Sequence, residues 1–383
     1  MEKLTLVRHE AQGNDFVIAL LSDQELRDLD TSLDVLGVER SDLARIVCDR
    51  DLGVGSRRGY VHSKGADGFV VGVHNAFDGQ RAECVRMHLL NADGSFAETS
   101  GNGLACLAMA SFDARIIGEG PLIPFETDAG TQRCTIGASG TGSLSLPDSN
   151  GRFIQVAMRK VEKGPEIPSE LYERISSDFG ANLRHLDTGD VGNPHLVIAL
   201  TQPPIDSPVS ELSNHAGELG DRIAQLGSVY ESYFHGGINV EFIWPFSRNP
   251  LRPEQAWTLQ MSVWERGAGL TVSCGSGSVV AATLAHRWEF VRIPNDPPPV
   301  SAENGDAVPP PSSYLVDMRT APFPGDNGSG FQYWVRTVPA YHEDFSPPQL
   351  GVVAERIETG LTLRLDRLPV LLDDLTARIG AQR

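Results

Sequence analysis

The chain has 383 residues, of which 40% are apolar and 21% are charged, which is typical of a globular protein, and its length favours two domains. The formal net charge of −18 argues against nucleic-acid binding, which requires basic surfaces. Because the sequence has no apolar run of about 18 residues or more, we expect no membrane-spanning helix.

The N-terminal part of the chain predicts two helices followed by a strand. Its first residues, Met1–Leu4, lack the apolar segment of a signal peptide, so we expect a cytoplasmic location. Ser22 and Glu25 form a capping box that predicts the start of a helix, and a second amphipathic helix is predicted over residues 41–48. Alternating apolar residues predict a strand at 69–73.

The C-terminal part has more strand-like segments than helical ones. Strands are predicted over residues 152–161, 196–200, 240–244, 314–318 and 331–338. Clusters of proline and glycine interrupt this pattern between about residues 293 and 330, and we interpret them as surface insertions, with a substrate lid as the alternative. The tail has a strand-like segment from Leu361 and an amphipathic helix over 370–379.

Two sequence landmarks each occur twice, in the same order. Gly13–Leu20 is similar to Gly192–Leu200, and Ser100–Gly103 is similar to Cys274–Gly277. The second pair is followed in both cases by a run of small apolar residues, which predicts a helix that begins at the turn. A repeat of this kind indicates two related halves.

Each of the two Gly-x-Gly turns places a reactive side chain, Ser100 or Cys274, at the start of a predicted helix. The positive end of a helix and its free N–H groups bind a carboxylate and stabilise a thiolate. If both turns faced one amino acid, they could hold its α-carboxylate and stabilise the negative charge that develops as the α-proton leaves. Two thiols on opposite faces could then remove and return that proton with inversion, without pyridoxal phosphate.

Six short motifs occur in a fixed order along the chain. They are Gly13–Phe16, Gly65–Gly68, Asn91–Ser95 with Ser100–Gly103, Gly192–His195, Asn239–Phe242, and Glu265–Gly269 with Cys274–Gly277. In order and composition they resemble the motifs of the diaminopimelate epimerase family. The resemblance implies an α/β fold of two pseudo-symmetric domains, each a mostly antiparallel, barrel-like sheet around a central helix. It also implies a small amino-acid substrate, no cofactor and a homodimer.

The resemblance further implies roles for individual residues. Cys274 matches a catalytic acid/base thiol, and Ser100 stands where the family has its other catalytic cysteine. Amides and an arginine suit a substrate carboxylate, and a glutamate suits an ammonium group. Any one asparagine alone is better explained as a turn residue, but the matched contexts together favour substrate binding. The expected substrate-binding residues are Asn14, Asn91, Gly101, Asn102, Asn193, Asn239, Glu265, Arg266, Gly275 and Ser276.

The sequence departs from the family pattern at three positions near these motifs. Ser100 replaces a cysteine, Leu270 replaces a common glutamate and Ala105 replaces a common arginine. A serine hydroxyl is far less acidic than a thiol and acts as a base only with a partner that takes its proton. Ser100 could be an engineered substitution, could leave Cys274 as the sole base, or could deliver a proton through water.

The sequence favours an isomerase that inverts the α-carbon of a diaminopimelate-like amino acid. A one-base lyase or isomerase that uses Cys274 is the first alternative, and a non-catalytic ligand-binding homologue is the second. A dinucleotide-binding enzyme is disfavoured, because Gly53–Gly59 lacks the GxGxxG spacing and precedes no convincing βαβ unit.

The cysteines and histidines predict no metal site. Five cysteines at irregular spacings indicate neither a disulfide framework nor a zinc motif, and ten histidines form no HExxH-like cluster. Outside the turn at Cys274, we expect buried and inert thiols at Cys48, Cys84, Cys106 and Cys134.

We expect three parts in the domain organisation. An N-terminal epimerase-like domain spans 1–150, and a C-terminal one spans 151–345 and includes the insertion. The remaining residues, 346–383, form a strand and helix extension that could pack on the N-terminal domain.

Overall fold

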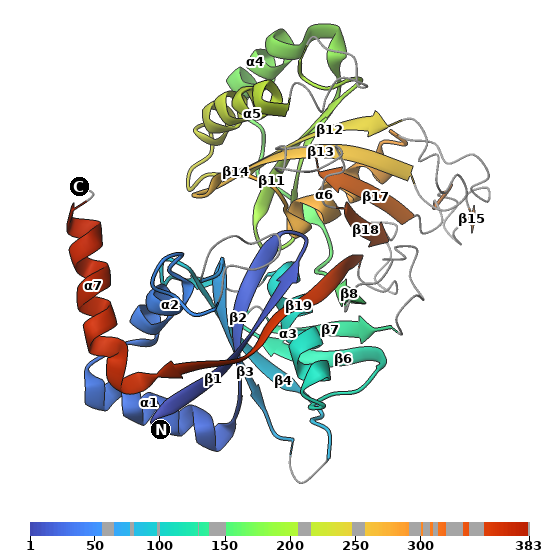
Figure 1. The fold of residues 1–383 in the computed structure, drawn as a ribbon. Helices are drawn as coiled ribbons and strands as arrows, with labels where there is room; N and C mark the ends of the chain where they lie inside the picture. The colour runs from blue at the N-terminus through green and yellow to red at the C-terminus, as the bar shows by residue number, and fades with distance from the viewer. Residues whose placement is uncertain are drawn as a thin grey trace. The chain divides into compact units, whose positions relative to one another are not determined.

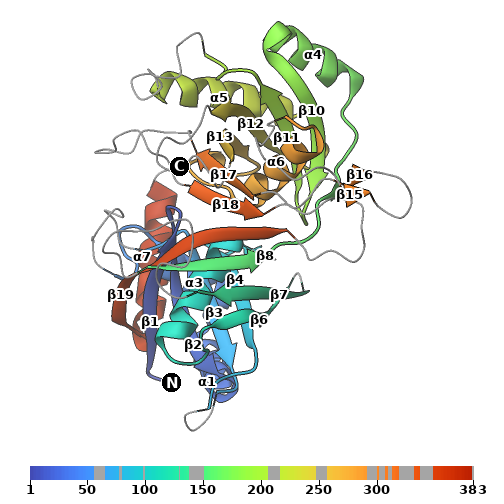
Figure 2. The same cartoon turned by 90° about the vertical axis from the view of Figure 1, so that its right-hand side faces the viewer.

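The computed structural model divides into two compact units (Figures 1 and 2). Unit 1 comprises Met1–Val156 together with Val352–Arg383, and unit 2 comprises Ala157–Gly351. The residues that the structure describes are 1–55, 65–76, 80–97, 100–128, 130–137, 151–205, 216–246, 257–290, 300–301, 307–308, 313–318, 332–336 and 348–381. Most of the predicted insertion at 293–330 and residues 56–59 of the disfavoured dinucleotide motif lie outside these ranges.

Unit 1 is a mixed sheet that curls around one buried helix, α3 (Gly101–Asp113). Its other elements are β1 (Lys3–Ala11), β2 (Asn14–Ser22), α1 (Asp23–Leu36), α2 (Arg40–Cys48), β3 (Gly68–His74), β4 (Val85–Asn91), β5 (Phe96–Ala97), β6 (Gly120–Thr127), β7 (Gly130–Ile136), β8 (Arg152–Ala157), most of β19 (Gln349–Arg364) and α7 (Leu368–Ala381). Strand β19 pairs with both β1 and β8, and α3 contacts β1, β2, β3, β4 and β7. Helix α3 is apolar on nearly every side, as a helix enclosed by strands must be.

The C-terminal segment of the chain belongs to the core of unit 1. Leu363, Leu368 and Leu375 are buried in the same apolar cluster as residues of α1 and α2. Helix α7 stands against α2, as Figure 1 shows, and Arg378 on α7 forms an ion pair with Asp51.

Unit 2 repeats this design around helix α6 (Gly275–Arg287), which contacts β10, β11, β12, β13, β17 and β18. Its other elements are β9 (Glu162–Lys163), α4 (Ser169–Phe179), β10 (Leu183–Asp190), β11 (Pro194–Leu200), α5 (Ala216–Glu231), β12 (Asn239–Phe246), β13 (Trp257–Glu265), β14 (Gly269–Thr271), β17 (Ser313–Met318) and β18 (Gln332–Arg336). The two-residue strands β15 (Val300–Ser301) and β16 (Ala307–Val308) pair with each other.

The strand pairings confirm the predicted internal repeat. In unit 1, β2 pairs parallel with β3, β3 antiparallel with β4, β4 parallel with β6 and β6 antiparallel with β7. In unit 2, β11, β12, β13, β17 and β18 follow each other with the same alternation of directions. The predicted α/β fold with two barrel-like sheets around central helices is therefore confirmed.

Most predicted elements are present, although several of their ends differ, and the strand of the C-terminal tail begins at Gln349 instead of Leu361. The capping box at Ser22 and Glu25 begins α1 as expected, but α2 begins at Arg40 because Asp42 accepts a hydrogen bond from the Glu39 N–H. The strand predicted over 152–161 ends at Ala157, where the chain passes from unit 1 to unit 2. Cys84 is only half-buried, which corrects the expectation of a buried thiol there.

No helix within the described ranges is both long and apolar enough to span a bilayer.

Candidate functional site

Ser100 is the N-terminal cap of α3. Four of the expected site residues come together at this turn: Ser100, Gly101, Asn102 and Asn14. The Ser100 backbone is extended (φ −148°, ψ 123°), and its hydroxyl oxygen accepts a hydrogen bond from the Gly103 N–H at 3.1 Å. Within the same turn, Asn102 Nδ2 donates to Asn14 Oδ1 at 2.7 Å. Asn14 follows Gly13, whose positive φ of 82° makes the tight connection from β1 to β2.

A chain of alternating charges lies behind Asn14 in unit 1. Asn14 Nδ2 donates to Asp67 at 3.4 Å, and Arg50 forms ion pairs with both Asp67 and the buried Asp15. Asp15 in turn pairs with Arg8, which is also fully buried. Burial and the charge of Asp15 raise the pKa of Asp67, and Arg50 opposes that rise. This network fixes the position of one side of the Asn14 amide.

Cys274 caps α6 in the same way as Ser100 caps α3. Its backbone is extended (φ −143°, ψ 105°), and its sulfur accepts a hydrogen bond from the Gly277 N–H at 3.4 Å. Ser276 Oγ lies 3.5 Å from this sulfur and accepts a hydrogen bond from Asn193 Nδ2 at 3.4 Å. The contact of Asn193 with Ser276 matches the contact of Asn14 with Asn102 in unit 1.

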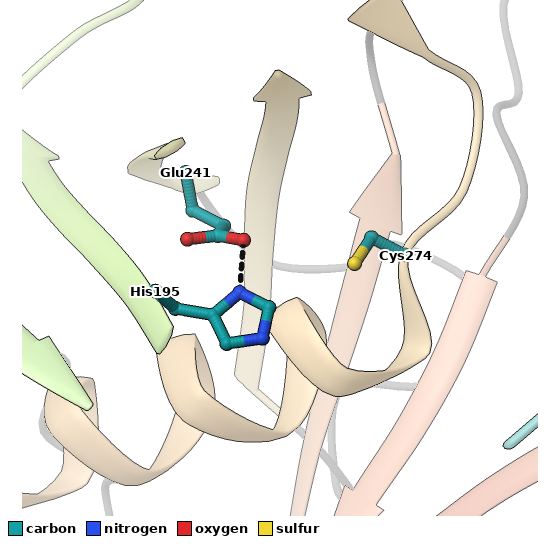
Figure 3. Close-up of side chains that lie close together, drawn as sticks. All are labelled: His195, Glu241 and Cys274. Carbon is teal, nitrogen blue, oxygen red and sulfur yellow. Dashed lines mark hydrogen bonds and ion pairs between the residues drawn. The ribbon is translucent and has the colours of Figure 1, made fainter. Parts of the chain in front are cut away.

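Two buried ionisable side chains lie beside the Cys274 sulfur (Figure 3). His195 Nδ1 and Glu241 Oε1 are joined by a hydrogen bond of 2.6 Å, and both side chains are 0% exposed. One donor atom from each of His195, Glu241 and Cys274 lies within 4.8 Å of the other two. The Cys274 sulfur points toward the pair, which places a carboxyl group, an imidazole and a thiol close together.

The charges around Cys274 favour its neutral form. Burial, followed by the negative charges of Glu265 and Glu241, raises the pKa of the Cys274 thiol well above its ordinary value. Burial also raises the pKa of Glu241, and the neighbouring His195 opposes that rise. The thiol is therefore protonated at neutral pH and needs a proton acceptor or a positive partner to become a thiolate.

Three further expected residues form a connected set in unit 2. Asn239 Oδ1 accepts a hydrogen bond from the Arg266 N–H at 2.9 Å, and Glu265 accepts one from Thr271. The negative charge of Glu265 also contributes to the raised pKa of Cys274. In unit 1, Asn91 donates to Ser95 Oγ at 2.9 Å across the β4–β5 turn. The predicted substrate-binding role of Asn91 stays a prediction.

His195 and Glu241 are functional candidates to which the motif comparison assigned no role. They lie on neighbouring parallel strands, with His195 opposite Asn239 and Glu241 two residues further on. Alternation along a strand puts residues 239 and 241 on the same face of the sheet. The polar residues at the starts of these two apolar strands were the available sequence signal.

The side chains that pack behind the two turns differ sharply. A Cβ atom added to Gly277 would lie 2.5 Å from Glu241 Oε1 and 3.1 Å from the Cys274 sulfur. A Cβ atom added to Gly103 would instead meet Phe16 and Met87, each at 3.3 Å. The two turns therefore have the same backbone conformation, but a carboxylate packs against the Cys274 turn and apolar groups pack against the Ser100 turn.

Known proteins place this architecture in a family. No family model matches the chain. Diaminopimelate epimerase from Natranaerobius thermophilus is 30% identical over 296 residues, which cover 74% of this chain and 85% of that protein. The chain belongs to the diaminopimelate epimerase family. Diaminopimelate epimerase 2 from Nostoc sp. is similarly 29% identical over 289 residues, covering 73% of this chain and 80% of that protein.

Solved structures agree with this family at the level of the fold. A PhzF-family phenazine biosynthesis protein from Bacillus anthracis superposes with a TM-score of 0.55 at 12% identity, over 95% of this chain and 100% of that one. A methylitaconate-delta-isomerase gives a TM-score of 0.51 at 11% identity, over 96% and 97% of the two chains. This diaminopimelate epimerase family member thus shares its overall fold with these two proteins.

Proposed function

We propose that this protein is a cofactor-independent isomerase that removes and returns the α-proton of a diaminopimelate-like amino acid. The observation that carries the proposal is the cap of α6, where the Cys274 sulfur stands at a glycine-rich helix start beside a buried imidazole and carboxylate. A helix start of this kind binds a carboxylate, and the sulfur beside it reaches the neighbouring carbon.

Substrate binding brings a positive charge close to the Cys274 thiol. The ammonium group on the α-carbon offsets the negative charges of Glu265 and Glu241, which oppose ionisation of the thiol. The His195–Glu241 pair accepts the thiol proton, and the resulting thiolate takes the α-proton of the substrate. Backbone N–H groups of the α6 turn stabilise the carboxylate as negative charge moves onto it.

The far end of the substrate is recognised by polar side chains that the structure holds in place. Asn193 is fixed through Ser276, and Asn239 is fixed through the Arg266 backbone. The proposal assigns a distal ammonium to Glu265 and a distal carboxylate to the Arg266 guanidinium and the asparagine amides. This chemistry suits an amino acid with a zwitterionic far end.

Inversion needs a proton donor for the face of the α-carbon that Cys274 does not serve, and the family resemblance assigns this role to Ser100. Serine is too weak an acid to match a thiol in this role, so proton return on that side passes through water held by the hydroxyl. We expect this step to limit the rate.

One-base chemistry is the second candidate, and a specific observation favours it. Phe16 and Met87 lie behind the Ser100 turn, whereas Glu241 and Cys274 surround the equivalent glycine in unit 2. A lyase or isomerase that takes and returns its proton on a single face needs only the Cys274 turn.

Proton exchange with solvent distinguishes these functions. The protein is incubated in D₂O with LL- and meso-diaminopimelate and with other diamino or dicarboxylic amino acids, and α-deuterium is followed by NMR. Inversion gives deuterium in both stereoisomers, while one-base chemistry gives deuterium with retention or a product that lacks water or ammonia. If ligand binds but neither exchange nor product forms, the protein is a binding homologue and the proposed enzymology is wrong.

The Ser100→Cys variant tests whether the α3 turn is built for inversion. If the stereoisomer ratio changes faster in this variant than in the wild type, the result supports chemistry on both faces of the α-carbon, with the serine oxygen in place of sulfur limiting the rate. An unchanged ratio alongside continued single-face exchange favours the one-base function.

A further inference from the structure

His195, Glu241 and Cys274 form a compact set of three different metal-ligand types in unit 2. The imidazole comes from β11, the carboxylate from β12 and the thiol from the cap of α6. One donor atom from each lies within 4.8 Å of the other two, and all three side chains are buried. Figure 3 shows the sulfur directed toward the other two residues.

Part of the hydrogen-bonding capacity of this set is unused. His195 Nε2 and Glu241 Oε2 are buried and have no hydrogen-bond partner among the described residues. A buried polar atom without a partner has lost its hydration and gained nothing in return, so a ligand that paired with these atoms would be favoured. Because the donors come from packed strands and a capped helix, little ordering is needed to bring them together.

The donor types select the class of ligand. One thiolate, one imidazole and one carboxylate form a combination typical of zinc, and their two negative charges balance a divalent cation. In a tetrahedral zinc site neighbouring ligand atoms are about 3.3–3.7 Å apart, so ligation through both atoms of the 2.6 Å contact, His195 Nδ1 and Glu241 Oε1, requires that contact to open by roughly 1 Å. Hard cations such as Mg²⁺ and Ca²⁺ prefer oxygen ligands in larger numbers.

We propose that His195, Glu241 and Cys274 bind one thiophilic divalent cation of the Zn²⁺ class, with a water molecule as the fourth ligand, and that this cation is an inhibitor. The bound metal engages the sulfur lone pair that would take the substrate proton and separates His195 from Glu241. Metal binding itself depends only on the three donors, while its inhibitory effect rests on the proposed function of Cys274.

Cobalt spectroscopy tests the site directly. The purified full-length protein is stripped with EDTA and titrated with Co²⁺, and the near-ultraviolet thiolate-to-cobalt band and the visible bands are recorded. We expect one equivalent to bind with the intensity of a four-coordinate site and to be displaced by one equivalent of Zn²⁺, but not by Mg²⁺. No thiolate band in the wild-type protein overturns the proposal.

Variants assign the band to the three donors. Cys274→Ser should abolish it, and the fold should tolerate this change because serine already caps α3 in the equivalent turn. His195→Asn and Glu241→Gln should each weaken Co²⁺ binding about 100-fold, no less than the loss of an outer-shell partner. Cys84→Ser, which removes a half-buried thiol elsewhere, should leave the band unchanged. A band that survives in Cys274→Ser overturns the assignment.

The second turn supplies a matched control. Ser100→Cys adds a thiol at a helix cap that has Phe16 and Met87 behind it in place of a carboxylate. The number of bound Co²⁺ ions should stay at one, and a second thiolate band of similar affinity would show that a capping cysteine alone suffices.

Activity separates this site from the proposed function. With an active substrate, preincubation with Zn²⁺ should stop α-deuterium exchange, and EDTA should restore it. A cobalt site in a protein that exchanges no amino acid would retain the metal site and refute the enzyme, whereas exchange without a cobalt site would do the reverse.

Discussion

The turn before α3 and the turn before α6 have nearly the same backbone conformation but are surrounded by different side chains. Ser100 and Cys274 cap their helices with nearly equal dihedral angles, and each accepts a hydrogen bond from the glycine three residues later. Behind Cys274 lie a carboxylate and an imidazole, and behind Ser100 lie a phenyl ring and a thioether. The repeated fold thus supplies two capped helix starts, and the strands beneath them place ionisable groups beside the Cys274 start and apolar groups beside the Ser100 start.

The largest expected difference between the turns is in activity. Cys274→Ala should lower α-proton exchange by about 10³-fold or more, because it removes the proposed acid/base group. Ser100→Ala should lower it by only about 10-fold, the equivalent of one hydrogen bond to a bound water. Exchange rates in D₂O measure both. Equal losses would show that the two turns contribute equally and would contradict the asymmetry.

Alanine substitution of the two glycines should also affect the two turns unequally, with the larger loss of stability at Gly277. Gly277→Ala places a methyl group 2.5 Å from Glu241 Oε1 and should destabilise the protein by about 1–3 kcal/mol through overpacking. Gly103→Ala meets side-chain carbons of Met87, Phe16 and Ser100, each at 3.3 Å, and its gain in helix propensity of up to about 1 kcal/mol offsets these contacts. Urea unfolding of both variants provides the measurement. A Gly277→Ala protein as stable as the wild type would mean that Glu241 is not packed against the turn.

The pH dependence should reveal the charge beside Cys274. Glu241 helps to raise the pKa of Cys274, so removing its charge in Glu241→Gln should lower that pKa. If thiolate is the reactive form, activity rises with pH through this pKa, and the midpoint of that rise should move to lower pH. The maximal rate should fall as well, because the His195–Glu241 proton acceptor is lost.

Thiolate absorbance near 240 nm and the pH–rate profile follow the two effects separately. Glu170→Gln, which removes an exposed carboxylate from α4, is the matched control and should leave the midpoint in place. A midpoint that stays unchanged in Glu241→Gln would show that Glu241 carries no charge in the active form.

The sequence predicted the parts of the site that depend on neighbours along the chain. The caps at Ser22, Ser100 and Cys274 were predictable because a helix start is specified within four residues. The repeat was predictable because glycine landmarks keep their order. The contact of His195 with Glu241 was not, because it depends on the parallel pairing of β11 with β12 across the intervening helix α5. The half-buried position of Cys84 and the end of β8 at Ala157 likewise depend on tertiary packing.

The smallest expected difference is in the stability of the two helix caps. Ser100 should stabilise its cap more than Cys274 does, whereas Cys274 should contribute more to activity. Serine is a preferred N-cap and its oxygen lies 3.1 Å from the Gly103 nitrogen, so Ser100→Ala should cost about 1 kcal/mol. The Cys274 sulfur lies 3.4 Å from the Gly277 nitrogen and accepts hydrogen bonds weakly, so Cys274→Ser should stabilise α6 by a few tenths of a kcal/mol to about 1 kcal/mol while abolishing activity. Hydrogen exchange of the Gly103 and Gly277 amides in the two variants measures each cap locally. If Cys274→Ser lowers the hydrogen-exchange protection of the Gly277 amide, the thiol is needed for the structure of its turn. That result would contradict the view that cysteine at this cap lowers stability in exchange for reactivity.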